Sequence, residues 1–374
     1  MSVPLSNTKH SQASHSQRLD AQQVVLAPME GVINASMREF LTGMGGYARC
    51  VTEFVRVTDV LLPERVFYRL CPELKQGGVT ASGVPVFVQL LGSHPAAIAD
   101  NAARAESLGA LGVDLNFGCP AKTVNSSMGG SILLRDPEIV GAIVSSVRRT
   151  LSSRVPLTVK IRLGYDNAEQ LPEIVDAVRS AGADELAIHA RTKFDGYKPP
   201  AFWQNVKPVM NDRTGLTPTR INGEIWTVAD AKQACADSGC TTVMLGRGAL
   251  AAPDLAQRIA SGDEHAMVMA WSELLPFIGK QFERYDSSNP RYVGNRTKQW
   301  LAYLKRTYPE AAELFSRIRT LHDPELIAKE LAYAVQPKVG STNRLPLASN
   351  LTESSDISRK VRANLGNQVE AQRR

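Results

Sequence analysis

A cysteine in a short turn is the side chain with the clearest chemical potential in this sequence of 374 residues. Cys119 stands in the segment Asn116-Phe117-Gly118-Cys119-Pro120, directly after an apolar run, and the Gly-Cys-Pro turn would lift its thiol out of the core. The nearby Lys122 is expected to shift the pKa of this thiol toward neutral pH. Pro120 and the later pair Gly129-Gly130 also set this cysteine apart, so we expect it to donate a proton. The other cysteines occupy apolar or helical segments typical of buried structural thiols: Cys50, Cys71, Cys235 and Cys240.

Other short apolar runs in the first two thirds of the chain also end at polar or sulfur-containing side chains. In sequence order the ends are Met29 with Glu30, Glu53, Gln89, Asn116 with Cys119, Lys160 with Arg162, His189 with Arg191, Asn222-Gly223-Glu224, and Gly246 with Arg247. Any single one could be an ordinary cap or a buried hydrogen-bonding group. Eight such ends together predict a polar site built where the strands finish.

Two of these strand ends suit a phosphate group. Asn222-Gly223-Glu224 and Gly246-Arg247-Gly248 offer backbone N–H donors and a cation after the last two runs, where barrels commonly bind phosphate. Lys160 would add a cation on the opposite side, and Gln89 an amide that both donates and accepts, which suits the ring of flavin mononucleotide, FMN. Lys160 could instead form the Schiff base of an aldolase, although that chemistry would leave Cys119 without a role.

Strands that share one edge are needed to bring these ends together, and the sequence supplies eight short apolar runs. They cover residues 24–27, 50–54, 86–90, 113–116, 157–161, 186–189, 220–222 and 243–245. Amphipathic stretches at 95–109, 136–151 and 227–239 lie between them, and the last two open on a capping Asp136 or Thr227. Eight βα units predict an α/β fold, a TIM (β/α)8 barrel over residues 21–262. A doubly wound open sheet is the alternative, which the count of eight disfavours.

A change in composition and in the spacing of apolar residues after the predicted barrel predicts a second domain. Residues 271–334 favour helix and space their apolar residues accordingly, as in Trp300, Leu301 and Leu304. This pattern predicts a small all-helical domain at residues 266–336. Residues 1–20 and 337–374 are polar, and we expect both to be disordered tails.

One stretch of the helical region is rich in positive charge. Residues 291–306 hold five cations and no acid, interleaved with Tyr292, Trp300 and Tyr303. This combination suits phosphates and stacked bases. A solvated helix face with a few core aromatics is the alternative interpretation.

Composition and charge limit the function classes. No apolar run approaches the roughly 18 residues of a membrane span, and the first residues lack a secretory signal, so we expect a cytoplasmic protein with no membrane association. The five cysteines form no C-x-x-C pair, which indicates neither a disulfide framework nor a metal site. The formal net charge of +6 permits a polyanionic partner without requiring one. Nothing indicates a protein partner, and we expect a monomer.

Eight segments, in the same order along the chain, resemble the tRNA-dihydrouridine synthases over residues 24–334. They are Leu26-Ala-Pro-Met-Glu-Gly31, Thr52-Glu-Phe54, Phe87-Val-Gln-Leu90, Asp114-Leu-Asn-Phe-Gly-Cys-Pro-Ala-Lys-Thr-Val124, Val159-Lys-Ile-Arg162, Ile188-His-Ala-Arg-Thr-Lys193, Asn222-Gly-Glu224 and Leu245-Gly-Arg-Gly248. The resemblance implies an FMN-binding TIM barrel and a helical domain that helps to hold tRNA. It also implies that NADPH reduces the flavin, that hydride passes to C6 of a uracil flipped out of the tRNA, and that a cysteine protonates C5.

The resemblance assigns roles to individual residues by motif position. The FMN contacts would be Pro28, Met29, Glu30, Gln89, Lys160, His189, Asn222, Gly223, Glu224, Gly246 and Arg247. Cys119 would be the catalytic acid, because hydride addition at C6 leaves enolate charge that an acid near C5 must quench. Asn116 would hydrogen-bond the extruded base.

Three features resemble the branch of the family that modifies position 16 in the D-loop. They are the segment Glu53-Phe-Val-Arg-Val57, Tyr197 after Arg-Thr-Lys, and the stretch Asn295-Arg-Thr-Lys-Gln-Trp-Leu-Ala-Tyr303. The tRNA contacts so implied are Arg56, Tyr197, Arg296, Lys298, Tyr303 and Arg319. One departure is the polar segment Thr217-Pro-Thr-Arg-Ile-Asn222, which predicts an irregular backbone at the seventh strand.

Three alternatives to this function stay open. The first is the same chemistry at another D-loop uridine. The second is an FMN-dependent reductase of a small pyrimidine or enone, which would not explain a separate helical domain with a cluster of cations and aromatics. The third is a tRNA-binding protein without catalysis, which would not explain Cys119, Lys160 and Arg247.

Overall fold

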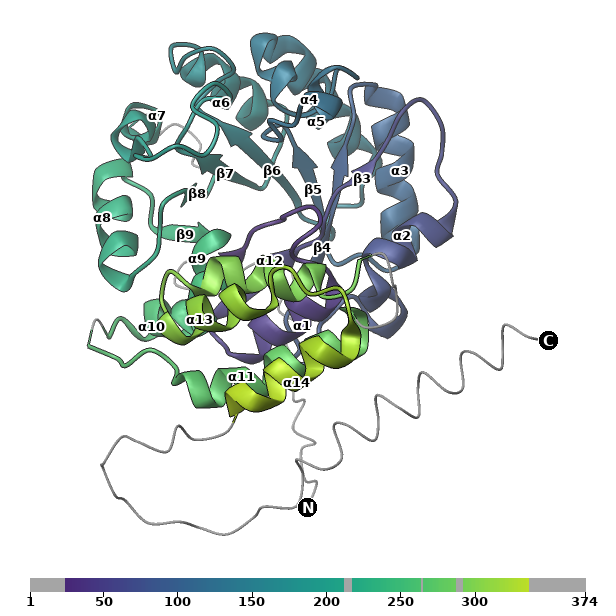
Figure 1. The fold of residues 1–374 in the computed structure, drawn as a ribbon. Coiled ribbons are helices and arrows are strands. Elements are labelled where there is room, and N and C mark those ends of the chain that lie inside the picture. Colours follow the sequence, from purple (N-terminus) through teal and green to yellow (C-terminus); the bar gives the residue numbers. More distant parts are fainter. Residues whose placement is uncertain (1–23, 212–216, 264, 287–291, 336–374) are drawn as a thin grey trace, which may run out of the picture. The chain divides into compact units, whose positions relative to one another are not determined.

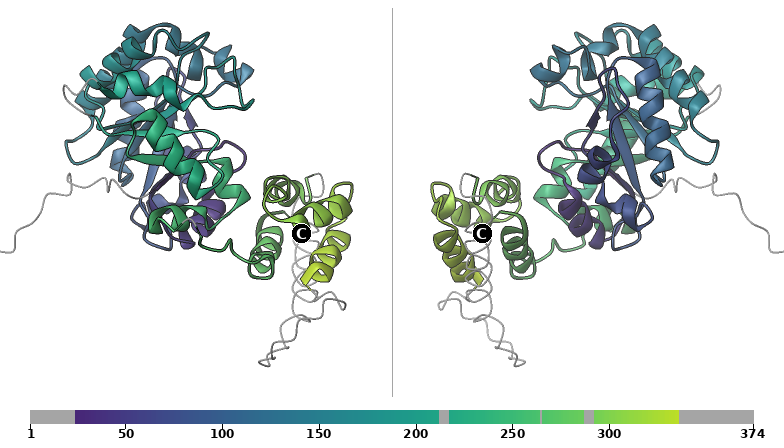
Figure 2. Two further views of the ribbon diagram at one scale, coloured as in Figure 1. Left: turned by 90° about the vertical axis from the view of Figure 1, so that its left-hand side faces the viewer. Right: turned by 90° about the vertical axis from the view of Figure 1, so that its right-hand side faces the viewer.

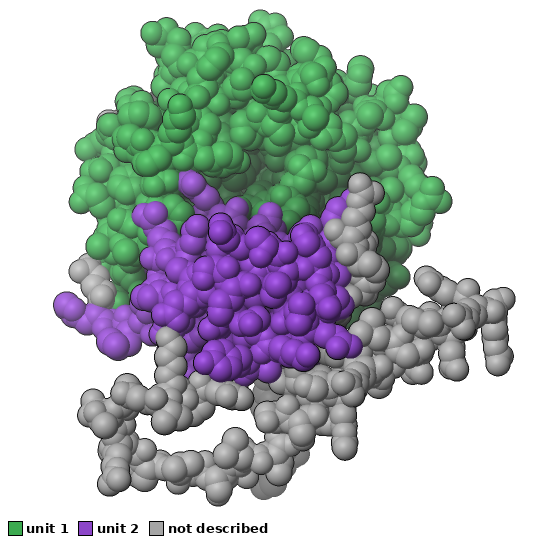
Figure 3. All heavy atoms as spheres, viewed as in Figure 1, with its two compact units in different colours: residues 1–246, 256–264 green, residues 247–255, 265–374 purple. Residues whose placement is uncertain are grey.

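The structure, a computed structural model, describes residues 24–211, 217–263, 265–286 and 292–335 (Figure 1). The tails predicted at residues 1–20 and 337–374 lie outside these ranges. The chain forms two compact units, coloured separately in Figure 3. The first comprises residues up to Gly246 together with Ala256–Glu264, and the second comprises Arg247–Leu255 and the residues from His265 onward.

Parallel strands of the first unit close into a barrel, which confirms the predicted TIM fold. The eight barrel strands in the described residues are β1 (Val24–Leu26), β2 (Tyr47–Val51), β4 (Val86–Leu91), β5 (Val113–Asn116), β6 (Leu157–Arg162), β7 (Glu185–His189), β8 (Thr219–Asn222) and β9 (Thr242–Leu245). The short β3 (Val55–Arg56) pairs with β4. Because β1 pairs with β9 and β2 pairs with β4, the sheet closes, and the doubly wound alternative is excluded.

Helices surround the ring of strands in the first unit (Figure 1). They are α1 (Ala35–Gly43), α2 (Glu64–Leu70), η1 (Pro72–Gln76), α3 (Pro95–Ser107), α4 (Lys122–Asn125), η2 (Gly130–Arg135), α5 (Pro137–Thr150), α6 (Leu171–Ser180), η3 (Trp203–Val206), α7 (Lys207–Asn211) and α8 (Val228–Ser238). The predicted caps are confirmed. Asp136 accepts from two backbone N–H groups of α5, and Thr227 forms a capping box with Asp230 at the start of α8. A further helix, α10 (Leu255–Ser261), follows β9 and α9.

Strand β8 is regular, so the irregular backbone predicted from its polar residues is wrong. It pairs in unbroken register with β7 and β9. The buried Arg220 donates from Nε to Glu185 Oε1 at 2.7 Å, and Arg49 of β2 forms an ion pair with the same carboxylate. A polar strand can be buried regularly when neighbouring strands supply opposite charge, because the ion pairs offset the cost of desolvation.

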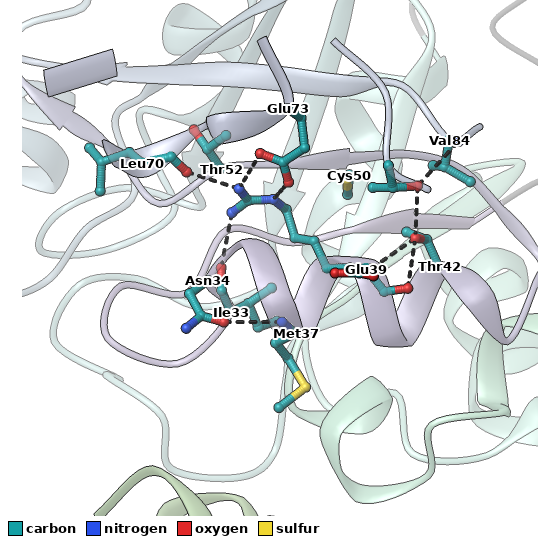
Figure 4. A network of polar contacts seen from close by, with 12 residues as sticks. Ile33, Asn34, Met37, Glu39, Thr42, Cys50, Thr52, Leu70, Glu73 and Val84 are labelled. Atoms are coloured by element: carbon teal, nitrogen blue, oxygen red, sulfur yellow. Dashed lines mark hydrogen bonds and ion pairs between the residues drawn. The ribbon is translucent and has the colours of Figure 1, made fainter. Parts of the chain in front are cut away.

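A second buried ion pair fixes the helix that follows β1 (Figure 4). The guanidinium of Arg38 in α1 lies 2.9 Å from both carboxylate oxygens of Glu73 in η1, through Nε and Nη2. Arg38 also donates to the carbonyl oxygens of Leu70 and Ile33. These contacts tie α1, and thereby the end of the loop that leaves β1, to the segment between β3 and β4.

The second unit is helical, as its apolar spacing predicts (Figure 2). Its helices in the described residues are α9 (Arg247–Ala251), α11 (Trp271–Gln281), the π-helical turn η4 (Phe282–Asp286), α12 (Asn295–Leu304), α13 (Pro309–Ile318) and α14 (Pro324–Val335). Trp300, Leu301 and Leu304 of α12 are buried, and the Trp300 indole donates to the Leu250 carbonyl of α9 at 3.1 Å. Nowhere in the described ranges is there a helix long and apolar enough to cross a membrane.

Candidate active site

The backbone turn at Cys119 is held by the last residue of β5. Asn116 Oδ1 accepts hydrogen bonds from the backbone N–H groups of Gly118 and Cys119, each at 2.9 Å. The other end of the same amide donates to Gln89 Oε1 at 2.8 Å. The strand end therefore fixes the backbone that carries the thiol, as expected for a site built on a rigid element.

Contacts from the following segment hold the opposite side of the turn. The Cys119 carbonyl accepts from Ser131 N and Oγ and from Asn125 Nδ2, at 2.9–3.0 Å. Gly130 has a φ of +67°, and a Cβ there would lie 2.7 Å from the Cys119 carbonyl oxygen. Only glycine allows this approach without strain, which gives Gly130 a physical role.

The Cys119 thiol is half-buried and has a raised pKa. Burial raises the pKa, and Glu30 adds to the rise, while the Ala121 N–H, Arg162 and Arg56 partly oppose it. The predicted shift toward neutral pH under the influence of Lys122 is therefore wrong. Lys122 is exposed at the start of α4, and desolvation of the thiol outweighs the cations that do act on it. A thiol that stays protonated at neutral pH suits proton donation rather than nucleophilic attack.

Lys160 links three strand ends at the same edge of the barrel. Its buried ammonium donates to Asn222 Oδ1 at 3.1 Å, and Asn222 donates in turn to the Met244 carbonyl. Strand register places Asn116 beside Lys160, and His189 beside Asn222. Burial, reinforced by the neighbouring Arg162, lowers the pKa of Lys160 to about 8.

This edge fits an anionic, electron-rich group. Lys160 has three donors, yet within the described residues it forms one hydrogen bond and no ion pair with a carboxylate. Gly223, with a φ of +116°, passes so close to His189 that a Cβ would lie 2.8 Å from the imidazole Cδ2. Gly223 therefore leaves no room for a side chain between the backbone and His189, and the buried Lys160 cation beside it keeps donors for an anionic or electron-rich group.

The loop after β1 is the next part of the predicted site. Glu53 accepts a hydrogen bond from the Gly31 N–H at 2.6 Å, which ties the Pro28-Met29-Glu30 loop to the segment between β2 and β3. Pro28 and Met29 are partly buried, and Glu30 is exposed. The predicted flavin residue Arg247 is the first residue of α9 and belongs to the second unit.

Two buried arginines, which the sequence placed at strand ends without a role of their own, belong to the site. Arg162 donates from Nε to the Gly118 carbonyl at 2.7 Å and from Nη1 to the carbonyls of Thr192 and Gly196. It therefore joins the Cys119 turn to the loop that follows β7. The sequence identified Arg162 as a strand-end residue, but its contacts with the two loops follow only from the structure.

Arg191 has the corresponding position at the end of β7. Its Nε donates to the Lys198 carbonyl at 2.7 Å, and Nη2 lies 2.9 Å from Glu224 Oε1. The exposed Tyr197 lies on the loop that follows β7, between the contacted residues Gly196 and Lys198, with the Arg162 guanidinium 5.3 Å from its ring centroid. The two arginines thus hold the loop that presents Tyr197.

The residues predicted to contact tRNA have different environments. Arg56 in the first unit is exposed, and so are Arg296 and Arg319 in the second, while Tyr303 is half-buried. Lys298 is buried and donates to the Leu321 carbonyl at 2.5 Å, a contact that does not favour its prediction as a tRNA ligand. Trp300 is part of the helical core, as the alternative interpretation of this cluster expects. Arg291 lies outside the described residues.

No group of three or more His, Cys, Asp or Glu side chains in the described ranges could hold a metal ion. The polar side chains described above at this edge are a thiol, amides, a lysine, an imidazole and two arginines.

Comparison with known proteins decides the family. Residues 25–334 match the family described as dihydrouridine synthase. The chain belongs to the dihydrouridine synthases. A Pseudomonas putida relative is 47% identical over 317 residues, which cover 84% of this chain and 98% of the relative. A Shewanella oneidensis relative is 48% identical over 313 residues, covering 83% and 98%. Both relatives carry the name tRNA-dihydrouridine(16) synthase.

Proposed function

We propose that this dihydrouridine synthase reduces uridine to 5,6-dihydrouridine at position 16 in the D-loop of tRNA, with bound FMN and with NADPH as the reductant. Relatives that match almost over their full length and bear the name tRNA-dihydrouridine(16) synthase support the substrate and the position. The observation that carries the chemistry is a half-buried thiol, whose pKa is raised by burial, on a turn anchored at the barrel edge that holds Lys160.

FMN would supply the hydride that adds to C6 of the uracil. The residues that we propose to hold it are the strand-end residues Gln89, Lys160, His189, Asn222, Gly223, Glu224 and Gly246, with Pro28, Met29 and Glu30 from the loop after β1, and Arg247 from α9. Lys160 would offer its two unused N–H donors and its positive charge to the electron-rich edge of the ring.

Cys119 would complete the reduction. Hydride addition at C6 leaves the charge of an enolate on the uracil, and the thiol proton would pass to C5 as the S–H bond breaks. The thiolate that remains would be stabilised by Arg162 and Arg56, the two cations that favour the charged form of this thiol, until a proton from water restores it. Because its pKa is raised, the thiol would stay protonated until the negative charge on the uracil draws the proton to C5.

Binding of tRNA would depend on charge in both units. The exposed Arg56 donates to Ser127 Oγ at 3.3 Å and lies over the Phe54 ring, so its guanidinium is held near the Cys119 segment. Arg296 and Arg319 would meet phosphates from the helical unit, and Tyr197 would offer a ring to a flipped base. The uracil must leave its stack to reach the barrel, at a cost that is smallest in a loop.

A reconstituted reaction tests this function. The purified protein is loaded with FMN and mixed with NADPH and an unmodified tRNA transcript, and the nuclease-digested product is analysed by mass spectrometry. We expect two added hydrogen atoms on the fragment that contains position 16. Reduction of free uridine with no change in tRNA would support the small-molecule reductase instead, and a protein that stays colourless with FMN would refute the cofactor.

A further inference from the structure

A chain of polar side chains inside the barrel lies behind the Cys119 turn, and the proposed chemistry leaves its far end unexplained. Asp114, two residues before Asn116 on β5, is 1% exposed. Its carboxylate accepts from Gln89 Nε2 at 2.7 Å and from the Thr158 hydroxyl on β6. Gln89 in turn accepts from Asn116, whose Oδ1 holds the Cys119 N–H.

The two ends of this hydrogen-bonded series fix which group donates and which accepts in each bond. A carboxylate can only accept hydrogen bonds, and a backbone N–H can only donate them. Gln89 must therefore present its NH₂ group to Asp114 and its oxygen to Asn116, and Asn116 must present its own oxygen to the turn. Each amide has a single orientation that satisfies both neighbours, and reversing either one would place two donors or two acceptors face to face.

We propose that Asp114 is a positioning residue for Cys119, acting through Gln89 and Asn116 to hold the turn in the geometry that presents the thiol. The catalytic consequence rests on the proposed function, whereas the effect on the thiol does not. Strand register supports the proposal, because Gln89 and Asp114 face each other across β4 and β5, as do Asp114 and Thr158 across β5 and β6.

The charge of Asp114 is consistent with this role. Burial raises the pKa of Asp114 to about 6, opposed by the hydrogen bonds from Gln89 and Thr158 and by the nearby charges of Arg49 and Lys160. The carboxylate is thus mainly ionised at pH 7.5 and can accept both hydrogen bonds at once. A buried carboxylate that served packing alone would not need to be joined by two amides to the backbone of a functional cysteine.

Two substitutions at Asp114 test whether the turn depends on a hydrogen-bond acceptor at this position or only on a side chain that fills the space. Asp114→Asn keeps the shape, and its oxygen can accept from Gln89 while its NH₂ group donates to the Thr158 hydroxyl. Asp114→Leu keeps the branching at Cγ, with a somewhat larger side chain, but leaves the Gln89 NH₂ group buried without an acceptor, which should loosen the turn. The first readout is the rate at which iodoacetamide alkylates Cys119 in the FMN-loaded protein, followed by peptide mass spectrometry.

We expect Asp114→Leu to speed alkylation of Cys119 by about tenfold and to slow reduction of tRNA by about tenfold, with NADPH reduction of the flavin nearly unchanged. Asp114→Asn should stay within about threefold of the wild type in both measurements. Cys235, a half-buried thiol on α8, is the internal control and should keep its rate in every variant. Wild-type behaviour of Asp114→Leu, or equal defects in both variants, would overturn the proposal.

An isosteric pair keeps the proposal testable if Asp114→Leu fails to fold. Gln89→Glu places two acceptors opposite each other and should speed alkylation of Cys119, whereas Gln89→Glu combined with Asp114→Asn restores a donor between the two positions and should slow it again. A double variant that alkylates as fast as Gln89→Glu alone would overturn the inference. Failure of the wild type to reduce tRNA would refute the proposed function, while the alkylation rates would still decide the role of Asp114.

Discussion

The pKa of Lys160 allows a quantitative prediction of how the affinity for FMN changes with pH. Burial lowers the pKa of this ammonium to about 8, so the free protein loses the charge as the pH rises through that value. An electron-rich flavin edge placed against the ammonium would raise its pKa again, because an opposite charge favours the protonated form. Binding above pH 8 must therefore be accompanied by proton uptake, and the affinity for FMN should fall as the pH rises.

The size of the effect follows from the pKa. If only the ammonium form binds FMN, the dissociation constant increases by the factor 1 + 10^(pH − 8), which is about 1.1 at pH 7 and about 11 at pH 9. The tenfold loss corresponds to about 1.4 kcal/mol of binding free energy. Quenching of flavin fluorescence, titrated with apoprotein from pH 6.5 to 9, measures the constant directly.

Two variants isolate Lys160 in this measurement. Lys160→Met should bind FMN more weakly at pH 7 and show little change up to pH 9, because its side chain has no proton to lose. Lys122→Met removes an exposed cation near the Cys119 turn and should keep the wild-type slope. A wild-type affinity that is independent of pH, or an unchanged slope in Lys160→Met, would refute the placement of this ammonium against the flavin.

Three further predictions address the acid, the tRNA surface and the fold. Cys119→Ala should keep FMN binding and flavin reduction by NADPH but slow reduction of tRNA by about a hundredfold or more in single-turnover kinetics, and equal turnover would refute its role as the acid. Arg296→Glu with Arg319→Glu should weaken tRNA binding and reduce its dependence on salt, as seen in filter binding from low to high ionic strength, and an unchanged salt slope would show that these cations do not contact phosphates. Glu73→Leu should cost about 3–5 kcal/mol in urea unfolding, because it leaves the Arg38 guanidinium charged and buried, and a loss below about 1 kcal/mol would contradict that estimate.

The barrel was predictable because the local sequence signals for strands, helices and helix caps match the elements of the fold in that part of the chain. Short apolar runs alternate with amphipathic stretches, and capping residues such as Asp136 and Thr227 stand where the structure has them. The strand ends then follow from topology, since parallel strands of a barrel finish at the same edge. Cys119, Lys160 and Asn222 could be assigned to that edge from sequence position alone.

Properties that depend on three-dimensional surroundings were not predictable in the same way. The pKa of Cys119 is set mainly by burial, and a cation three residues away in sequence proved to have less influence than desolvation. The polar strand β8 is regular because Glu185 lies on its neighbour, a pairing that requires strand register. Lys298 and Trp300 could not be separated from Arg296 until the buried face of α12 was known.

Hydrogen bonds between side chains on neighbouring strands could not be predicted from the sequence either. Gln89, Asp114 and Asn116 were visible in the sequence as polar residues in or after apolar runs, but nothing in one strand specifies what its side chains meet in the next. The chain from Asp114 to the Cys119 backbone appears only when β4, β5 and β6 are in register. The same holds for Arg162, whose partners lie on loops that follow β5 and β7.

Mapping of dihydrouridine in cellular tRNA tests the proposed function most directly. Total tRNA from a strain that lacks this gene would be compared with tRNA from the same strain complemented with the wild type or with Cys119→Ala. We predict that dihydrouridine at position 16 disappears in the deletion, returns with the wild type and stays absent with the variant. Unchanged dihydrouridine at position 16 in the deletion strain would contradict the proposed function.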